Sequence, residues 1–228
     1  MRKLPRARKS QRKKSPKGIR AVIFDLDGVL IDSESVFSRI VERFLKKEYG
    51  ISITEEDVSN ATGMSDEGLF RYVLEKYGVE VDPKKYKEVA WSYFRKRKRL
   101  PRTKKALQAV RALSRKFPLA VASASYSWYV GKFLKAEGFR KYLRFYLGRD
   151  DVRNAKPSPE IYLLAAKRLG IPPENCLVIE DSFPGISAAK AAGMACIALK
   201  GGHNPAGIDR SKADSVISEL SELINLLS

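Results

Sequence analysis

Short apolar runs alternating with helical patterns constrain the fold of this chain more than any other feature. The runs are rich in Ala, Val, Ile and Leu and lie at 21–24, 119–122, 176–179 and 195–199, with shorter ones near 145–147 and 215–217. Segments with helical periodicity lie between them, at about 103–116, 127–137, 159–169 and 184–192. Such alternation is typical of parallel strands joined by helices. We therefore predict an α/β fold with a doubly wound parallel sheet.

A long segment between the first two of the longer runs carries helical periodicity alone, with apolar residues at helical spacing in 36–45 and 69–77. Gly50 and Gly78 are typical helix C-terminal signals, and we expect Ser33 to cap the first of these helices. The pattern predicts an inserted helical domain beside the sheet.

The predicted domain boundaries follow from this reading. Residues 20–32 and 103–228 form the core, and residues 33–102 form the inserted helical cap. Hinges are expected near Ile31–Ser33 and Leu100–Thr103, because a cap that opens and closes must bend where its two connections leave the core.

Two carboxylates, Asp25 and Asp27, directly follow the first apolar run. Asp and Gly also occur in ordinary turns, so the pair alone has a structural explanation. Ligands of doubly wound sheets, however, bind beyond the carboxyl ends of the strands. Alternate residues of an extended segment point to the same side. The pair can therefore hold a cation, or one acid can attack a substrate while the other moves protons.

Polar residues also follow the later runs, in a fixed order. Ser123 ends the second long run, Lys156 precedes the helical pattern at 159–169, and Glu180 and Asp181 end the third long run. Each residue alone also fits a turn serine, a solvated lysine or a helix cap. Their joint order at successive strand ends favours a site for phosphate and a metal ion.

The stretch FDLDGVLIDSE at 24–34, with the later phrases KPSPEIY and VIEDSFPGISAAKAAGM, resembles the haloacid dehalogenase-like hydrolases. The closest likeness is to the phosphatase and beta-phosphoglucomutase-like branch, which has a small helical cap on a Rossmann-like core. The likeness runs from about Arg20 to the C-terminus. It implies a phosphatase that hydrolyses a small phosphorylated metabolite, of the sugar phosphate or phosphoglycolate type, through an aspartyl-phosphate.

The resemblance assigns catalytic roles that agree with the chemistry of phosphoryl transfer, which needs positioning and charge neutralisation. Asp25 would be the nucleophile. Asp27 would protonate the leaving oxygen and later take a proton from water. Ser123 would donate a hydrogen bond to the phosphoryl group, and Lys156 would place a positive charge beside both the phosphate and the nucleophile.

The resemblance also implies Mg²⁺ as the cofactor. Its protein ligands would be Asp25, the backbone carbonyl of Asp27, and Asp181, an all-oxygen set that suits a hard cation. Two roles stay open for Glu180, as a further metal ligand or as a residue that orients Lys156.

Further substrate contacts are expected from Thr62 and Ser65, which match a cap segment that enters the active site in the family, and from Ala124. Alternatively, Thr62 and Ser65 belong to an ordinary loop between two helices and do not contact the substrate. Mutases of this branch carry a histidine about a dozen residues beyond the nucleophile, where this chain has Phe37. This departure favours hydrolysis over the alternative of a sugar-phosphate mutase.

Charge is concentrated at the N-terminus of a chain with a net charge of +18. Residues 1–19 are rich in Lys and Arg and almost free of apolar residues, so we predict a disordered tail. Non-specific contact of this tail with nucleic acid is an alternative use, although it has no aromatic residue for base stacking. A nucleic-acid-associated protein with a vestigial core is the rival from a different class.

Several other classes are excluded or disfavoured. No apolar run approaches the roughly 18 residues of a membrane helix. The basic N-terminus is not followed by the apolar segment of a signal peptide, so a cytoplasmic location is expected. With His203 as the single histidine and only two cysteines, the chain lacks the residues for a zinc site or a Ser-His triad.

Overall fold

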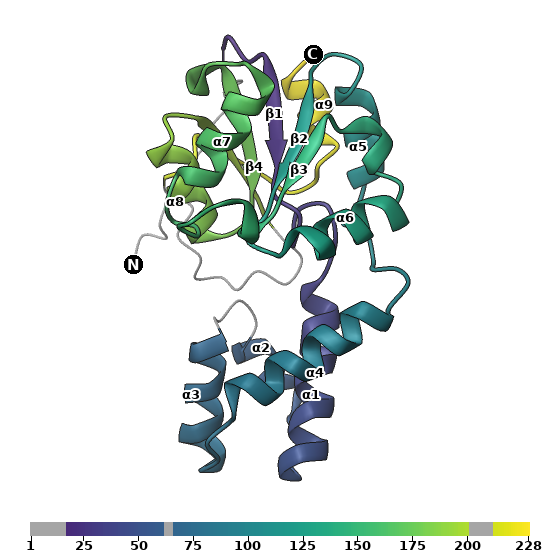
Figure 1. Ribbon diagram of the computed structural model, residues 1–228, viewed down its shortest axis with the longest axis vertical. Coiled ribbons are helices and arrows are strands. Elements are labelled where there is room, and N and C mark those ends of the chain that lie inside the picture. Colours follow the sequence, from purple (N-terminus) through teal and green to yellow (C-terminus); the bar gives the residue numbers. More distant parts are fainter. Residues whose placement is uncertain (1–16, 62–65, 201–211) are drawn as a thin grey trace, which may run out of the picture.

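The computed structural model describes residues 17–61, 66–200 and 212–228. In these residues six parallel strands form one sheet in the order β3-β2-β1-β4-β5-β6 (Figure 1). The strands are β1 Ala21–Phe24, β2 Leu119–Ala122, β3 Phe145–Leu147, β4 Cys176–Glu180, β5 Ala195–Leu199 and β6 Ser215–Ile217. The predicted doubly wound α/β fold is confirmed. The strand order reverses between β1 and β4, which places β1 at the point where such sheets bind ligands.

Helices cover both faces of the sheet because each central strand is apolar on both sides. Val22 and Phe24 of β1 belong to the core cluster under α5 (Ala106–Leu113), α6 (Ser127–Ala136) and α9 (Glu222–Leu226). Ala21 and Ile23 belong to the cluster under α7 (Glu160–Leu169) and α8 (Phe183–Ala191). The described connections contain three short 3-10 helices, at Arg140–Tyr142, Arg149–Asp151 and Pro173–Asn175.

The described residues of 33–61 and 66–102 form four helices, which gather beyond the carboxyl ends of the strands (Figure 1). They are α1 Glu34–Tyr49, α2 Glu55–Ala61, α3 Asp66–Tyr77 and α4 Pro83–Lys96. The buried carboxylate of Asp57 joins α2 to α3, because it accepts hydrogen bonds from Tyr72, Lys76 and Tyr77 of α3 and from Thr54, just before α2. The helical group therefore has an internal polar anchor in addition to its apolar packing.

The two connections between the helical group and the core run side by side. The backbone N–H of Asp32 donates to Pro101 O at 2.8 Å, and that of Thr103 donates to Leu30 O at 3.1 Å. The nearly buried carboxylate of Glu137 accepts the Leu100 N–H at 3.1 Å. The two segments expected as hinges are thus paired with each other and fixed to α6. Their bending stays a prediction.

The expected capping role of Ser33 is wrong in detail. Ser33 occupies the N-cap position of α1, but its side chain makes no capping hydrogen bond. Its backbone is in the right-handed helical region (φ −81°, ψ −24°) rather than the extended conformation of a typical capping residue. Asp32 Oδ1 instead accepts the Ser35 N–H at 3.3 Å.

At the N-terminal end of the described chain, the Gly18 carbonyl accepts a hydrogen bond from Asn175 Nδ2 at 2.8 Å, and Ile19 packs against the core. Gly18 and Ile19 were expected to belong to the tail. Residues 1–16, which form the rest of it, lie outside the described residues. No helix in the described ranges is long and apolar enough to cross a membrane.

Candidate active site

A tight turn after β1 carries the two predicted catalytic carboxylates. The Asp25 N–H donates to Ile179 O of β4 at 2.9 Å, which fixes Asp25 at the end of the strand. The chain then turns through Gly28, whose φ is +76°, and the Gly28 N–H donates to Ile31 O at 2.8 Å. The buried side chain of Leu26 anchors the turn in the core between the two acids. The strand and its turn thus hold both carboxylates at the carboxyl edge of the sheet.

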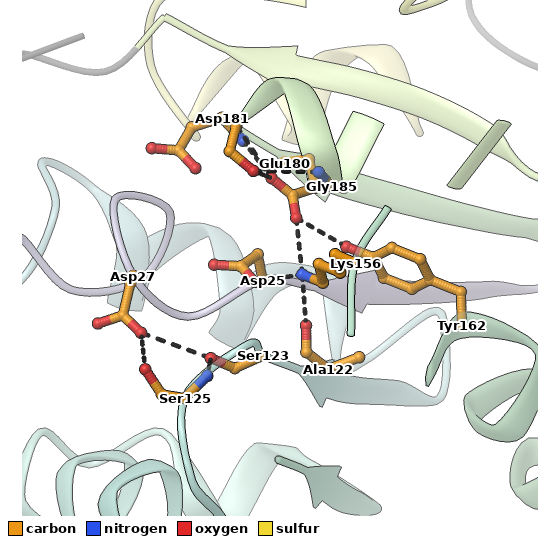
Figure 2. Close-up of polar contacts among 11 residues, drawn as sticks. Asp25, Asp27, Ala122, Ser123, Ser125, Lys156, Tyr162, Glu180, Asp181 and Gly185 are labelled. Atoms are coloured by element: carbon orange, nitrogen blue, oxygen red, sulfur yellow. Dashed lines mark hydrogen bonds and ion pairs between the residues drawn. The ribbon is translucent and has the colours of Figure 1, made fainter. Parts of the chain in front are cut away.

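Lys156 reaches Asp25 from the loop before α7. Its ammonium group donates to Asp25 Oδ1 at 2.5 Å, to Glu180 Oε1 at 2.7 Å and to Ala122 O at 3.1 Å (Figure 2). These three acceptors use all three N–H donors of the ammonium. Only 4% of the Lys156 side chain is exposed. The structure therefore brings together the ends of β1, β2 and β4 around one buried positive charge.

The charges in this cluster shift one another's proton affinity. Burial raises the pKa of Asp25 to about 7, with Glu180 and Asp27 adding to the rise and Lys156 opposing it. Burial also tends to lower the pKa of Lys156, but Asp25 and Glu180 more than offset it, so the net shift is upward. Lys156 is consequently a fixed cation, and Asp25 is a carboxylate that gains from any additional positive charge nearby.

Both carboxylate oxygens of Glu180 are occupied by the protein. Oε1 accepts from Lys156 and from Tyr162 Oη at 2.9 Å, and Oε2 accepts from Asp181 N at 2.9 Å and from Ser182 N and Oγ at 3.0 and 2.9 Å. Burial raises the pKa of Glu180, but Lys156 brings it below its usual range. Of the two expected roles, this geometry favours orientation of Lys156 over metal ligation.

Two residues that support Glu180 were not identified from the sequence. Tyr162 is fully buried on α7 and gives its hydroxyl to Glu180. Gly185, in the first turn of α8, lets the carboxylate pack against the backbone, since a Cβ there would lie 1.7 Å from Glu180 Oε1. A buried tyrosine hydroxyl needs a partner, which is the only signal in the sequence that points to Tyr162.

Asp27 lies among hydroxyl groups. Its Oδ2 accepts from Ser125 Oγ at 2.7 Å, with Ser123 Oγ farther away at 3.4 Å (Figure 2). Its Oδ1 accepts from Tyr129 Oη at 2.9 Å. Ser123 Oγ also accepts the Ser125 N–H at 3.0 Å. Ser123 therefore lies at the site as predicted, whereas Ser125 and Tyr129 are contacts that the sequence did not reveal.

The oxygen-rich side of the cluster fits a hard divalent cation. The Asp181 carboxylate lies against the turn after β1, because a Cβ on Gly28 would come within 1.9 Å of Asp181 Oδ2. This places it beside the backbone that follows Asp27, and both Asp25 and Asp181 are nearly buried. In the described part of the chain, no three His, Cys, Asp or Glu side chains group as a metal site. Asp25, Asp181 and the Asp27 carbonyl would supply only oxygen atoms, the donor type that Mg²⁺ prefers.

The three expected substrate contacts differ in what the structure says of them. Ala124 is exposed between the two serines that face Asp27. Thr62 and Ser65 lie outside the described residues.

Comparison with known families agrees with this fold. A family model described as haloacid dehalogenase-like hydrolase matches residues 22–199, which span every strand end that contributes to the site. The chain belongs to the haloacid dehalogenase-like hydrolases. The predictions of the family and of a hydrolase within it are confirmed.

Relatives with assigned activities include phosphatases. The chain is 32% identical over 179 residues to the phosphorylated carbohydrates phosphatase of Thermotoga maritima, covering 76% of this chain and 82% of that protein. It is 30% identical, over an alignment of 241 positions, to the phosphoglycolate phosphatase of Shigella boydii, and the match covers 92% of each protein.

A solved structure shares the whole architecture. The crystal structure of a HAD family hydrolase from Deinococcus radiodurans, with bound phosphate and sodium, superposes with a TM-score of 0.72 at 26% identity. The match covers 93% of this chain and 98% of that one, so it includes the helical group as well as the sheet.

Proposed function

We propose that this protein is a Mg²⁺-dependent phosphomonoesterase that works through an aspartyl-phosphate on Asp25. The observation that carries the proposal is the buried ammonium of Lys156, shared between Asp25 and Glu180 at the end of the central strand. A nucleophilic carboxylate that attacks a phosphate dianion needs fixed positive charge, and Lys156 supplies it at hydrogen-bond distance.

In the first step Asp25 attacks phosphorus. Lys156 binds Oδ1, and the other carboxylate oxygen points away from Lys156 (Figure 2), which leaves it for the attack. A bond forms between this oxygen and phosphorus, and the bond from phosphorus to the alcohol oxygen breaks. Asp27 gives its proton to the departing oxygen. The weak 3.4 Å contact of Ser123 Oγ with Asp27 leaves that hydroxyl able to turn toward a phosphoryl oxygen.

In the second step a water molecule attacks the phosphorus of the aspartyl-phosphate. Asp27, now ionised, takes a proton from the water. The bond between phosphorus and Asp25 breaks, so that inorganic phosphate leaves and the carboxylate is restored. Splitting the reaction in this way replaces one difficult hydrolysis with two displacements at the same centre.

Asp25, the Asp27 carbonyl and Asp181 would hold the Mg²⁺. When bound, the ion would neutralise charge on the phosphoryl group and on the two carboxylates. The rise in the Asp25 pKa that burial causes supports this proposal, since a cation beside Asp25 would stabilise its ionised form.

The proposed substrates are small phosphorylated metabolites, of the sugar phosphate or phosphoglycolate type. The names of the two relatives support this class. The absence of a histidine at Phe37 supports hydrolysis rather than a mutase reaction. A cytoplasmic location belongs to the same proposal, since substrates of this class are soluble metabolites.

The test is phosphate release from a panel of phosphate esters, with Mg²⁺ or with EDTA, by the wild type and by Asp25→Asn. We expect release that needs Mg²⁺ and that falls by at least about 10³-fold in the variant, because the nucleophile is lost. Phosphate release by Asp25→Asn at the wild-type rate would refute the aspartyl-phosphate mechanism.

A further inference from the structure

Tyr129 of α6 is a buried residue to which the proposed reaction has so far given no role. Its side chain has no exposed surface, and its hydroxyl donates to Asp27 Oδ1 at 2.9 Å. Ser33, at the start of the helical group, is also buried and lies close to the same hydroxyl. Tyr129 therefore lies between the start of the helical group and the proposed acid and base.

The ring of Tyr129 packs within a group of aromatic side chains. It packs against Phe94 of α4 with ring centroids 5.2 Å apart, and against Phe133 of its own helix at 4.8 Å. Both contacts are close to edge-to-face, which is a favourable arrangement for aromatic pairs. Lys132 of α6 also donates to Phe94 O at 2.8 Å, which fixes the end of α4 to the same helix. The hydroxyl is therefore presented to Asp27 by a ring with little freedom to move.

We propose that Tyr129 is a positioning residue that fixes the direction of the Asp27 carboxyl group for both proton transfers. The inference rests on the proposed function and adds a residue to it. Ser125 holds one oxygen of Asp27 and Tyr129 holds the other, so the two contacts together set the plane of the carboxyl group. Without the Tyr129 hydroxyl, the carboxyl group keeps only its hydrogen bonds on Oδ2 and can rotate, so that it no longer points toward the departing oxygen.

The role predicts a dependence on the leaving group. An alkyl alcohol leaves as an alkoxide and needs the proton from Asp27, whereas p-nitrophenolate is stable enough to leave without one. Loss of the Tyr129 hydroxyl should therefore slow the first step for glycerol phosphate and spare the first step for p-nitrophenyl phosphate. A purely structural role would lower both rates by the same factor.

The test compares Tyr129→Phe with Tyr146→Phe, which also removes one hydroxyl, from a partly buried tyrosine on β3 that has no hydrogen bond to Asp27. For Tyr129→Phe we expect a fall in kcat of roughly 10-fold or more on glycerol phosphate, about the value of one hydrogen bond to a charged group, with KM unchanged. The first-turnover release of p-nitrophenolate should stay within about 3-fold of the wild type. Tyr146→Phe should match the wild type on both substrates.

Three further outcomes decide the proposal. If Tyr129→Phe slows both substrates equally, or neither, the positioning role is overturned. In an Asp27→Asn background, Tyr129→Phe should cause no additional loss on glycerol phosphate, and a full additional loss would overturn action through Asp27. If Asp25→Asn releases phosphate as fast as the wild type, the proposed function fails and this inference fails with it. If the wild type is active and Tyr129→Phe has the same activity on both substrates, only the inference is refuted.

Discussion

Replacing Gly28 by alanine should damage the cation site more than the fold. Gly28 directly follows Asp27 in the turn after β1, and its φ is +76°. A Cβ at this position would lie 1.9 Å from Asp181 Oδ2 and 2.7 Å from its Cγ. The substitution therefore adds two separate costs, backbone strain and displacement of a proposed metal ligand.

The size of each cost follows from the geometry. A side chain in the left-handed region costs about 1–2 kcal/mol of stability relative to glycine. Ordinary contact needs about 3.4 Å, so the Asp181 carboxylate must move by about 1.5 Å. Displacements near 1 Å in an active site can cost about 10²-fold in rate, and disturbed support of a metal ligand costs about 10- to 100-fold in affinity.

The matched control is Gly193→Ala. Gly193 has nearly the same φ, +74°, but a Cβ there meets nothing within 4 Å. Both variants should lose similar stability in urea denaturation. Only Gly28→Ala should raise the Mg²⁺ concentration needed for half-maximal phosphate release, by about 10-fold or more, and lower kcat/KM by about 10²-fold.

One result would refute this reasoning directly. If Gly28→Ala and Gly193→Ala show the same Mg²⁺ dependence and the same kcat/KM, then the Asp181 carboxylate beside Gly28 is not part of the cation site. A large loss of stability in Gly28→Ala alone, without a change in Mg²⁺ dependence, would lead to the same conclusion.

Two further predictions concern the buried charges. Lys156→Met leaves Asp25 and Glu180 without their shared cation, so phosphate release should be lost and urea denaturation at pH 7 should show a deficit of about 3–5 kcal/mol; an unchanged unfolding free energy would contradict the burial of this pair. Burial raises the pKa of Asp57, but hydrogen bonds from Lys76 and two tyrosines more than offset this and hold it well below the ordinary 3.8. The stability that Asp57 contributes is therefore present above that pH and lost below it, so Asp57→Asn should melt below the wild type at pH 7, with the gap narrowing under acid conditions. If the difference in melting temperature between the wild type and Asp57→Asn stays the same from pH 7 to acid pH, Asp57 does not stabilise the protein in this way.

The sequence predicted the sheet well because its central strands are apolar on both faces. The six apolar runs correspond to β1–β6, including the short ones near 145–147 and 215–217. The helix predicted at 103–116 is shorter, Ala106–Leu113, since Thr103 belongs to the paired connections and donates to Leu30 O. Helix α9 was not predicted, because five residues are too few to show a helical period.

The candidate site was predicted in part. The order of polar residues at strand ends identified Asp25 and Lys156, and the structure places them in contact. The sequence did not identify Tyr129, because its contact depends on the angle at which α6 packs against the sheet. It did not identify Ser125 either, because that contact depends on the path of the loop between β2 and α6. Periodicity assigns Tyr129 to a buried helix face but cannot show that its hydroxyl ends beside a carboxylate.

The partners of Asp25 and Asp27 differ in a way that suits two different tasks. The ammonium of Lys156 can only donate, so it stabilises Asp25 as an anion, the form that attacks phosphorus. The hydroxyls of Ser125 and Tyr129 can donate or accept, so each can stay bonded to Asp27 whether or not that carboxyl carries a proton. An acid that must give a proton in one step and take one in the next needs such reversible partners. The division of roles between the two carboxylates is therefore carried by the chemistry of their neighbours, since the two side chains are identical.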